Sequence, residues 1–475
     1  MVLPALALAA VSFAAAPDTF FVRTDGGSAG QCDGRHDAAY GGAGLHQECA
    51  WRHPFEALPP GGPARIAGGD TLVIGSGNYR IGAGAAGTDA LEKCRRDWPW
   101  DCHLAVVPGG PSPAQPTRIV GAGFDRGCPA APQLWGAERA STVFDLSGSS
   151  NVMLACLEIT DRSGCIEFHA RDTQRCARES PPYGDWASTG ISAVDSANVR
   201  LRDLDIHGMA HDGIRAARVR DWTLEHVRID GNGWAGWNGD AGGGASSDGG
   251  TLLFRDVEIG WNGCGESWPA RRHDGCWGQE QGGYGDGLGT GATGGDWLFD
   301  HVDVHDNAQD GIDLLHAEAG ATITFRDVHA AGNAGNQLKA TGSVRVENSR
   351  IDGTCAALAT QHGLDAGDAC RARGNSILLR LPAGAHASIS GDTISGEGDC
   401  LIGLECAGEG CASATASVDG NRLSGSQRSG RDARLPCSLW VDPALHGASV
   451  LFSHNDVQST RNAGCPAETH GCAEN

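Results

Sequence analysis

A short pattern of alternating apolar and polar residues recurs through the centre of the chain and ends each time in Gly or Asn. The copies are Val199–Gly208, Trp222–Gly231, Leu252–Asn262, Trp297–Asn307, Ile323–Asn333 and Val344–Gly353. Uninterrupted copies follow one another after roughly 20–26 residues, and glycine-rich insertions account for the longer gaps. Strand-and-turn units at this period are typical of a solenoid, in which each unit buries its apolar face against its neighbours.

Among solenoids and related repeats, the pattern favours a parallel β-helix. Leucine-rich repeats need a fixed leucine and asparagine frame that is absent here, and propeller blades need about twice the period. The chain contains 72 glycines among 475 residues, which argues against an all-helical protein. We therefore predict an all-β, right-handed parallel β-helix with long loop insertions, since parallel crossovers are nearly always right-handed.

The repeats also suggest how the chain is divided. Residues 1–16 form a short apolar run ending in alanines, which we interpret as a signal peptide with an uncertain cleavage site. Residues 17–120 lack clear repeats and are predicted to form a disulfide-rich N-terminal cap with the first coils. Residues 121–436 are predicted to form the β-helix, with the candidate site in coils 286–342. Residues 437–475 are predicted to close the other end.

Cysteine content indicates an oxidising compartment. All 18 cysteines follow the apolar run, and several are close pairs in sequence: Cys94/Cys102, Cys156/Cys165, Cys264/Cys276, Cys355/Cys370 and Cys465/Cys472. No double C-x-x-C zinc pattern is present, so disulfides are favoured over metal thiolates. We expect a secreted or periplasmic protein.

Charge and hydropathy limit the possible partners. The formal net charge is −22, which disfavours binding to the phosphates of nucleic acids. No later apolar run approaches about 18 residues, so we expect no membrane insertion. We expect a monomer.

When the coils are aligned on their first strands, chemically active residues fall on one face. Asp212, Asp286, Asp310 and Asn336 occupy one predicted ladder, and Arg215, Gly289, Asp313 and Lys339 occupy a second ladder three positions later. Adjacent coils stack at about 4.8 Å, so Asp286, Asp310, Asp313 and Lys339 are expected within about three coils.

This grouping favours a calcium site beside a base. Clustered carboxylates repel one another unless a cation joins them, and hard oxygen ligands favour Ca²⁺. Only Lys93 and Lys339 are lysines among 36 basic residues. A lysine whose pKa is lowered by Ca²⁺ and Arg215 can act as a general base, whereas arginine cannot release its proton. The predicted reaction is β-elimination on an acidic (uronic acid) polysaccharide, whose carboxylates Ca²⁺ would bridge to the protein.

Ordinary turn chemistry offers a simpler interpretation of the same residues. Asp-Gly pairs are common in turns, and Asn336 could belong to a stacked polar ladder. An inverting glycoside hydrolase that uses two of the aspartates is a second enzymatic interpretation, although it gives Lys339 no role. A non-catalytic, secreted β-helix for polysaccharide binding or adhesion is a third.

The segment Gly285–Gly342 resembles polysaccharide lyase family 9, the β-helical pectate lyases. The motifs that carry the resemblance are Asp286-Gly287-Leu288, Asn307-Ala308-Gln309-Asp310-Gly311-Ile312-Asp313-Leu314 and Gly335-Asn336-Gln337-Leu338-Lys339-Ala340-Thr341-Gly342. By this resemblance, Asp286, Asp310 and Asp313 match calcium ligands and Lys339 matches the catalytic base. Gln309 departs from the family, which has a further aspartate ligand there.

Substrate contacts are expected from the insertions around the site. The loop Cys264–Gly285, tied by Cys264 and Cys276, contributes the predicted substrate-binding residues Trp268, Arg271, Arg272, Trp277 and Tyr284. Arg215, from the second ladder, is a further predicted substrate-binding residue. Aromatic rings stack on sugars and arginines pair with carboxylates. A second loop, Trp234–Gly250, offers Trp234, Trp237, Asp240 and Asp248. Packing of these tryptophans onto the coils is the alternative.

Overall fold

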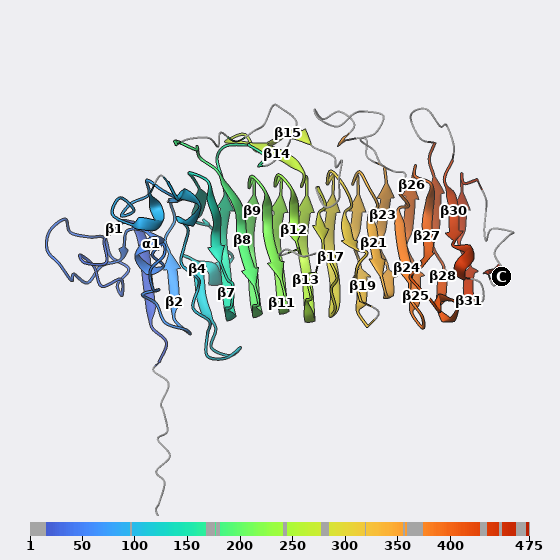
Figure 1. Cartoon of the computed structure of the whole chain (residues 1–475), viewed down its shortest axis with the longest axis horizontal. Coiled ribbons are helices and arrows are strands. Elements are labelled where there is room, and N and C mark those ends of the chain that lie inside the picture. Colours follow the sequence, from blue (N-terminus) through green and yellow to red (C-terminus); the bar gives the residue numbers. More distant parts are fainter. Residues whose placement is uncertain are drawn as a thin grey trace, which may run out of the picture.

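The computed structural model describes the chain from residue 16 onward. The described ranges are 16–95, 97–167, 176, 181–240, 245–276, 285–318, 320–354, 357–358, 374–427, 435–445, 449–461 and 472–474. Strands dominate these ranges and stack side by side along the molecule (Figure 1). No helix within them is long and apolar enough to cross a membrane.

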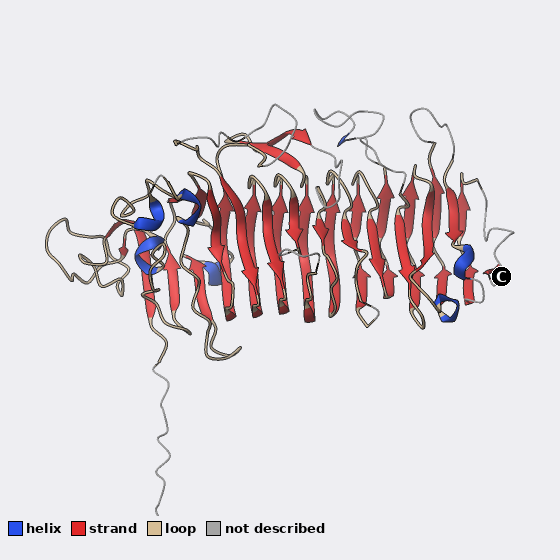
Figure 2. Ribbon diagram, viewed as in Figure 1, coloured by secondary structure: helices blue, strands red, loops and turns tan. Residues whose placement is uncertain are grey.

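Two parallel sheets make up the coils (Figure 2). The larger has 21 strands over the described ranges: β1 (Thr19–Gly27), β2 (Thr71–Ile74), β3 (Asn78–Ile81), β4 (Thr117–Gly121), β5 (Gln133–Gly136), β7 (Ser150–Thr160), β9 (Ala197–His207), β11 (Arg220–Asp230), β13 (Gly249–Gly260), β17 (Asp296–His305), β19 (Thr322–Arg326), β20 (His329–Ala331), β22 (Ser343–Glu347), β23 (Arg350–Gly353), β25 (His386–Ser390), β26 (Thr393–Gly396), β28 (Thr415–Asp419), β29 (Arg422–Gly425), β31 (Ser449–Ser453), β32 (Asp456–Gln458) and β33 (Cys472–Glu474).

The smaller sheet carries the candidate site. Its 10 strands are β6 (Ala140–Asp145), β8 (Ala187–Val194), β10 (Asp212–Ala217), β12 (Ala235–Asn238), β16 (Leu288–Gly289), β18 (Ile312–Leu314), β21 (Leu338–Thr341), β24 (Ile377–Leu381), β27 (Cys400–Cys406) and β30 (Cys437–Val441). All register pairs within both sheets are parallel, as in β18 with β21. The predicted fold class, a parallel β-helix, is confirmed.

A corner residue folds the larger sheet into two faces. Strand β17 pairs with β19 before its bend and with β20 after it. The residues at this corner have φ values from 51° to 56°: Asp203, His226, Asp256, His301 and Asp327. Asp, Asn and His tolerate this left-handed conformation better than other residues with a side chain. The repeated Asp or His therefore marks the bend in these five coils.

Inward-facing aromatic rings stack from coil to coil. Phe254 pairs in register with Phe299, and Phe299 with Phe325. Their ring centroids are 4.9 Å and 5.1 Å apart, and all three side chains are fully buried. The coil spacing of a parallel sheet therefore also sets the spacing of the stacked rings in the core.

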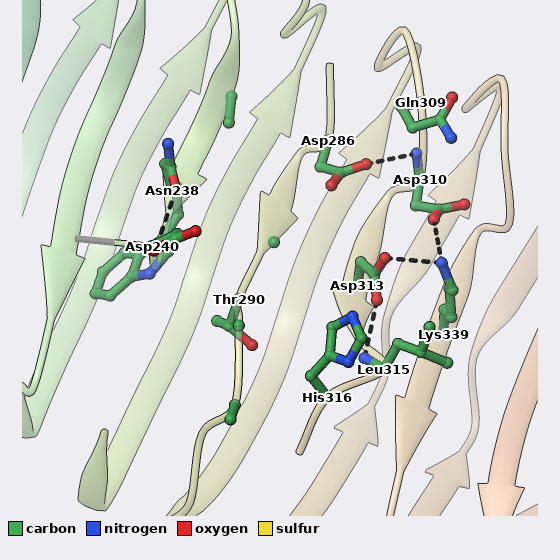
Figure 3. A pocket seen from close by; sticks show the side chains of 15 residues that line it. Asn238, Asp240, Asp286, Thr290, Gln309, Asp310, Asp313, Leu315, His316 and Lys339 are labelled. Atoms are coloured by element: carbon green, nitrogen blue, oxygen red, sulfur yellow. Dashed lines mark hydrogen bonds and ion pairs between the residues drawn. The ribbon is translucent and has the colours of Figure 1, made fainter. Parts of the chain in front are cut away.

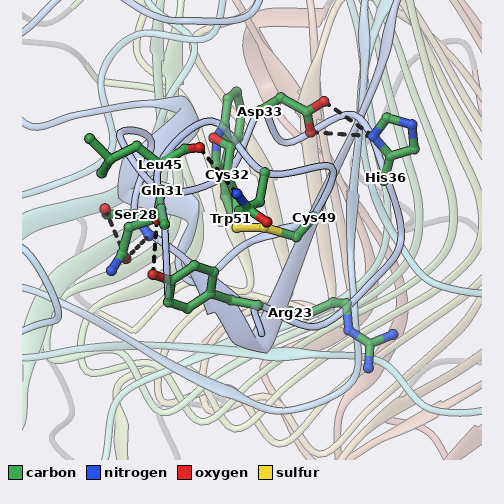
Figure 4. The surroundings of a disulfide bond; sticks show 12 residues. Arg23, Ser28, Gln31, Cys32, Asp33, His36, Leu45, Cys49 and Trp51 are labelled. Atoms are coloured by element: carbon green, nitrogen blue, oxygen red, sulfur yellow. Dashed lines mark hydrogen bonds and ion pairs between the residues drawn. A yellow bond between two sulfur atoms is a disulfide. The ribbon is translucent and has the colours of Figure 1, made fainter. Parts of the chain in front are cut away.

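The N-terminal end is closed by irregular chain and short helices. Helix α1 (Pro54–Ala57) and the 3₁₀ segments η1 (Glu92–Cys94) and η2 (Pro99–Asp101) lie there. Three further 3₁₀ segments lie elsewhere: η3 (Phe124–Arg126), η5 (Cys411–Ser413) and η6 (Pro443–Leu445). The disulfide Cys32–Cys49 joins the first loop, where the Trp51 indole N–H donates to the Cys32 carbonyl (Figure 4).

Disulfides are numerous within the described ranges. The bonds are Cys32–Cys49, Cys94–Cys102, Cys128–Cys156, Cys165–Cys176, Cys264–Cys276, Cys400–Cys437 and Cys406–Cys411. Two close pairs from the sequence are confirmed, but Cys156 bonds to Cys128 rather than Cys165, because β7 places it beside the preceding loop. Cys355, Cys370 and Cys465 lie outside the residues described, so the pairs Cys355/Cys370 and Cys465/Cys472 remain predictions. This content is typical of proteins that fold outside the cytoplasm.

Replacement of the central ring tests the core. We expect Phe299→Ala to reduce the free energy of unfolding by about 3–5 kcal/mol, because it removes buried area and leaves a cavity between two rings. Chemical denaturation followed by circular dichroism measures this change. The control is Leu451→Ala, whose side chain is 37% exposed and which we expect to change stability by less than about 0.5 kcal/mol. Equal effects of the two substitutions would contradict the stacked core.

Candidate active site

Side-chain oxygens link neighbouring coils just before the strands of the smaller sheet begin. Asp286 Oδ1 accepts the backbone N–H of Asp310 at 3.0 Å, and Asp310 Oδ1 accepts that of Asn336 at 2.6 Å. The ladder continues as Asn336 Oδ1 accepts the N–H of Asn375, and Asn375 Oδ1 that of Cys400. Asp286 and Asp310 thus each use one oxygen for a bond between coils rather than within a local turn, and Asn336 belongs to the same polar ladder. Their other oxygen is not needed for this link.

The second ladder lies three residues later along each strand. Gly289 pairs with Asp313, and Asp313 pairs with Lys339, as the alignment of the repeats predicted. Arg215 is on the same ladder, but Asn238 stands between it and Gly289. Four coil steps, or about 19 Å, therefore separate Arg215 from Lys339.

The ammonium of Lys339 bridges two carboxylates (Figure 3). Its Nζ lies 2.9 Å from Asp310 Oδ2 and 2.8 Å from Asp313 Oδ2. Burial opposes the charge of the ammonium, but Asp310 and Asp313 outweigh this effect and raise the pKa of Lys339. The lowered pKa expected from the sequence is therefore wrong for the chain alone, since its neighbours are anions and Arg215 is distant.

The buried environment that the carboxylates share raises the pKa of Asp286 and of Asp313. Burial, followed by the charges of Asp310 and Asp313, raises the pKa of Asp286 well above its usual range. Burial and the charge of Asp310 raise the pKa of Asp313, although Lys339 opposes this shift. The predicted mutual repulsion of the carboxylates is therefore present, and one lysine relieves only part of it.

These side chains line a hollow of about 600 Å³ on the smaller sheet. Other lining residues escaped the sequence analysis: Asn238, Thr290 and His316. Asn238 could have been found by its place in register with Gly289. Thr290 directly follows the short strand β16, and His316 lies two residues after β18, but the sequence carries no signal that their side chains reach the hollow.

The donor set fits a hard cation in its chemistry. Asp286, Asp310 and Asp313 supply only oxygen, and Gln309, which lines the same hollow, has a buried Oε1 without a hydrogen-bond partner. An amide oxygen is a suitable ligand for Ca²⁺. The described residues that bring three ligand atoms within 4.8 Å of one another are two other groups: Asp230, Glu266 and His273, and Asp300, His301 and Asp327. In the hollow, Lys339 instead holds Asp310 and Asp313.

The predicted substrate-binding insertion lies elsewhere. Trp268, Arg271 and Arg272 belong to an antiparallel hairpin of β14 (Cys264–Ser267) and β15 (Arg272–Cys276), and they do not line the hollow. Arg271 pairs with Asp205 at 2.8 Å, so it holds the hairpin against the coils. Trp277 and Tyr284 lie outside the described residues.

The other insertion was also partly misassigned. Trp237 lies on β12, is fully buried and packs edge-on against the ring of Trp222. Asp248 is buried and accepts the backbone N–H of Val219. Trp234 stacks on His211 with ring centroids 3.9 Å apart, and Asp240 lines the hollow. Of these four residues, Trp237 and Asp240 therefore line the hollow.

Comparisons with known proteins were made for the whole chain. No protein-family model matches it, and no curated protein matches it. Similar solved structures include pectate lyase Pel9A, with 11% identity, a TM-score of 0.40 and coverage of 91% of this chain and 81% of that one. The A-module of the mannuronan C-5 epimerase AlgE4 from Azotobacter vinelandii has 12% identity, a TM-score of 0.37 and coverage of 82% and 91%. The GH136 lacto-N-biosidase from Eubacterium ramulus has 10% identity, a TM-score of 0.41 and coverage of 93% and 68%. Similarities at this level say nothing about the chemistry of this site.

Two substitutions separate the two roles of Asp310. Asp310→Asn keeps an oxygen for the Asn336 N–H but loses the ion pair with Lys339, whereas Asp310→Ala loses both. We expect the alanine variant to be less stable than the asparagine variant by about 1–3 kcal/mol, because it leaves a buried N–H unpaired. Denaturant unfolding of both proteins measures the difference. Equal stability would show that the ladder bond contributes nothing.

A buried histidine predicts how stability depends on pH. Burial lowers the pKa of His207, but hydrogen bonds to Glu158 and to Glu266 on the hairpin raise it overall to about 9. Because this value exceeds the 6.5 of an unfolded histidine, the contribution is complete below pH 6.5 and is lost as pH rises through 9. We expect a loss of about 3 kcal/mol across this window. Thermal unfolding of the wild type and His207→Gln checks this, since the variant should lack that part of the decline.

Proposed function

We propose that the protein is a polysaccharide lyase that cleaves an acidic, uronic acid polysaccharide by β-elimination. One observation carries the proposal: Lys339 lies in an open hollow with its Nζ in contact with the carboxylates of Asp310 and Asp313. The chain has only one other lysine, Lys93, which pairs with Asp101 at the N-terminal end. Asp310 and Asp313 hold this amine protonated, so it could accept a proton only after a bound cation has neutralised them, whereas the carboxylates alone would suit only hydrolysis or binding.

Proton transfer to Lys339 would begin the reaction. The neutral amine takes the hydrogen from the sugar carbon next to the substrate carboxylate. The electron pair of that bond forms a carbon–carbon double bond, and the bond to the glycosidic oxygen two atoms away breaks. The leaving oxygen takes a proton from water, and the hydroxide that remains takes back the proton held by Lys339, so that the products are an unsaturated sugar end and a new sugar terminus and the amine is neutral again.

The acidic residues of the hollow would hold the cation that this chemistry needs. Asp286, Asp310, Asp313 and the unpaired oxygen of Gln309 are the proposed ligands of Ca²⁺. When bound there, Ca²⁺ would neutralise the protein and substrate carboxylates, which lowers the pKa of both Lys339 and the sugar carbon. Without a cation, a protein with a net charge of −22 would repel an acidic polymer.

The disulfide bonds indicate the compartment in which the protein acts. Seven disulfides within the described ranges favour a secreted or periplasmic protein. A polysaccharide substrate would be met in the same compartments.

Ultraviolet absorbance tests the proposed reaction, because elimination creates a conjugated double bond. The wild type would be incubated with a panel of polyuronates at alkaline pH, with Ca²⁺ or with a chelator. We expect absorbance to rise only with Ca²⁺, and we expect the rate of this rise to be about 10²–10⁴-fold lower in Lys339→Ala than in the wild type.

The matched control is Lys339→Arg. It keeps a cation beside Asp310 and Asp313 but stays protonated at ordinary pH and so cannot accept the proton of the substrate, and it should bind the polymer without cleaving it. New reducing ends without absorbance would instead indicate a hydrolase, and full activity of either variant would contradict the role of Lys339.

A binding protein is the second candidate, and the two ion pairs of Lys339 with Asp310 and Asp313 favour it, because they hold the amine as an ammonium. A permanent ammonium would pair with substrate carboxylates without chemistry. In that case polymer retention would persist in the wild type and in Lys339→Arg, with no absorbance and no reducing ends under any condition.

A further inference from the structure

The ladder that carries Lys339 continues into the last coils of the smaller sheet. Lys339 pairs in register with Leu378, Leu378 with Gly403, and Gly403 with Trp440. Trp440 therefore stands on the same line of the same face, three coil steps or about 14 Å from Lys339.

The exposure of Trp440 is unusual among the tryptophans of the coils. Its side chain is 37% exposed, whereas Trp186, Trp222, Trp237 and Trp297 are all less than 2% exposed. Strand β30 otherwise buries Leu439 and Val441 on either side of it. An indole turned outward from a packed sheet is available for contact with a ligand ring.

A second hollow connects this tryptophan with the proposed catalytic lysine. It measures about 730 Å³, and Lys339 lines both this hollow and the one described above. Its remaining lining mixes apolar and polar residues, and the polar ones include Asn336, Asn375, Asp399, Glu405 and Arg461. An aromatic ring among hydrogen-bonding groups is the combination that recognises a sugar, whose faces are apolar and whose rim carries hydroxyls.

The strands below the ring hold it in place. The disulfide Cys400–Cys437 joins β27 to β30 at the edge of the hollow. Gly403 lies beside Trp440 in register, and a Cβ there would come within 2.2 Å of Asn375 Nδ2. The amide of Asn375 therefore occupies the space above Gly403, between Leu378 and Trp440, and a side chain at residue 403 would displace it.

We infer that Trp440 is the stacking platform of a remote subsite for the same acidic polysaccharide, which runs across the coils from Lys339. This inference rests on the proposed function for the identity of the polymer. Because the platform lies about 14 Å from the base, only an oligosaccharide of several sugar units can occupy both places at once.

Chain-length dependence tests the subsite. We compare Trp440→Ala with the wild type on a size series of uronic acid oligosaccharides and on the polymer. We expect KM for the polymer to rise about tenfold with little change in kcat, and KM for the shortest cleaved oligosaccharide to stay unchanged. Trp440→Phe keeps a ring and should restore most of the affinity.

The control is Trp98→Ala. Trp98 is 55% exposed but belongs to the N-terminal end, so its loss should leave every KM unchanged. Thermal unfolding of each variant shows whether it is folded. If Trp440→Ala matches Trp98→Ala on the polymer, or if it raises KM equally for all lengths, the subsite is overturned.

Binding separates failure of the subsite from failure of the proposed reaction. The Lys339→Ala background is used for electrophoresis through gels that contain the polyuronate, with and without Ca²⁺. If no elimination is found but Trp440→Ala still weakens retention, the lyase is wrong and the subsite stands. If elimination is found and Trp440→Ala leaves retention intact, the lyase stands and the subsite is wrong.

Discussion

Hydrogen bonds from one coil's backbone to the side-chain oxygens of its neighbour determine where the residues of the candidate site lie. Asp286, Asp310, Asn336 and Asn375 each accept the N–H of the residue one coil further on. A buried N–H without a partner costs about 1–3 kcal/mol, so each bond also opposes a slip of the strands. Residues three positions later are carried along in register, and Asp313 and Lys339 become direct neighbours.

The same arrangement creates an electrostatic problem that the chain alone only partly solves. Asp286 and Asp310 each commit one oxygen to the ladder, while the second oxygen of Asp310 pairs with Lys339. Burial and like charges raise the pKa values of Asp286 and Asp313. Such strain is common where residues are arranged for function rather than stability. A bound cation would reduce the repulsion between these carboxylates, and it would also give a partner to the unpaired oxygen of Gln309.

Much of this could be predicted from the sequence because the coils repeat. A constant period puts equivalent positions above one another, so the alignment of Asp310 with Asn336 and of Asp313 with Lys339 follows from counting residues. The fold followed from the same period. The double use of Asp310 Oδ1 and Oδ2 could not be predicted, since both turn and site interpretations claimed the same side chain.

Features that depend on the third dimension were missed. The sequence Ala235–Asn238 looked like part of a loop, yet it forms β12 and buries Trp237 against Trp222. Arg271 looked available to substrate, yet Asp205 engages it. Trp440 gave no signal, because its strand lies beyond the clear repeats. In each case the neighbour that decides the role is remote in sequence, and only the stacked coils bring it close.

The most direct test of the account is a crystal structure of Lys339→Ala with Ca²⁺ and a long uronic acid oligosaccharide. We predict a cation bound by Asp286, Asp310 and Asp313, with the sugar acid beside it and the hydrogen-bearing carbon facing the position of the missing amine. An oligosaccharide bound away from the smaller sheet, or a cation held elsewhere while these carboxylates stay unliganded, would contradict it.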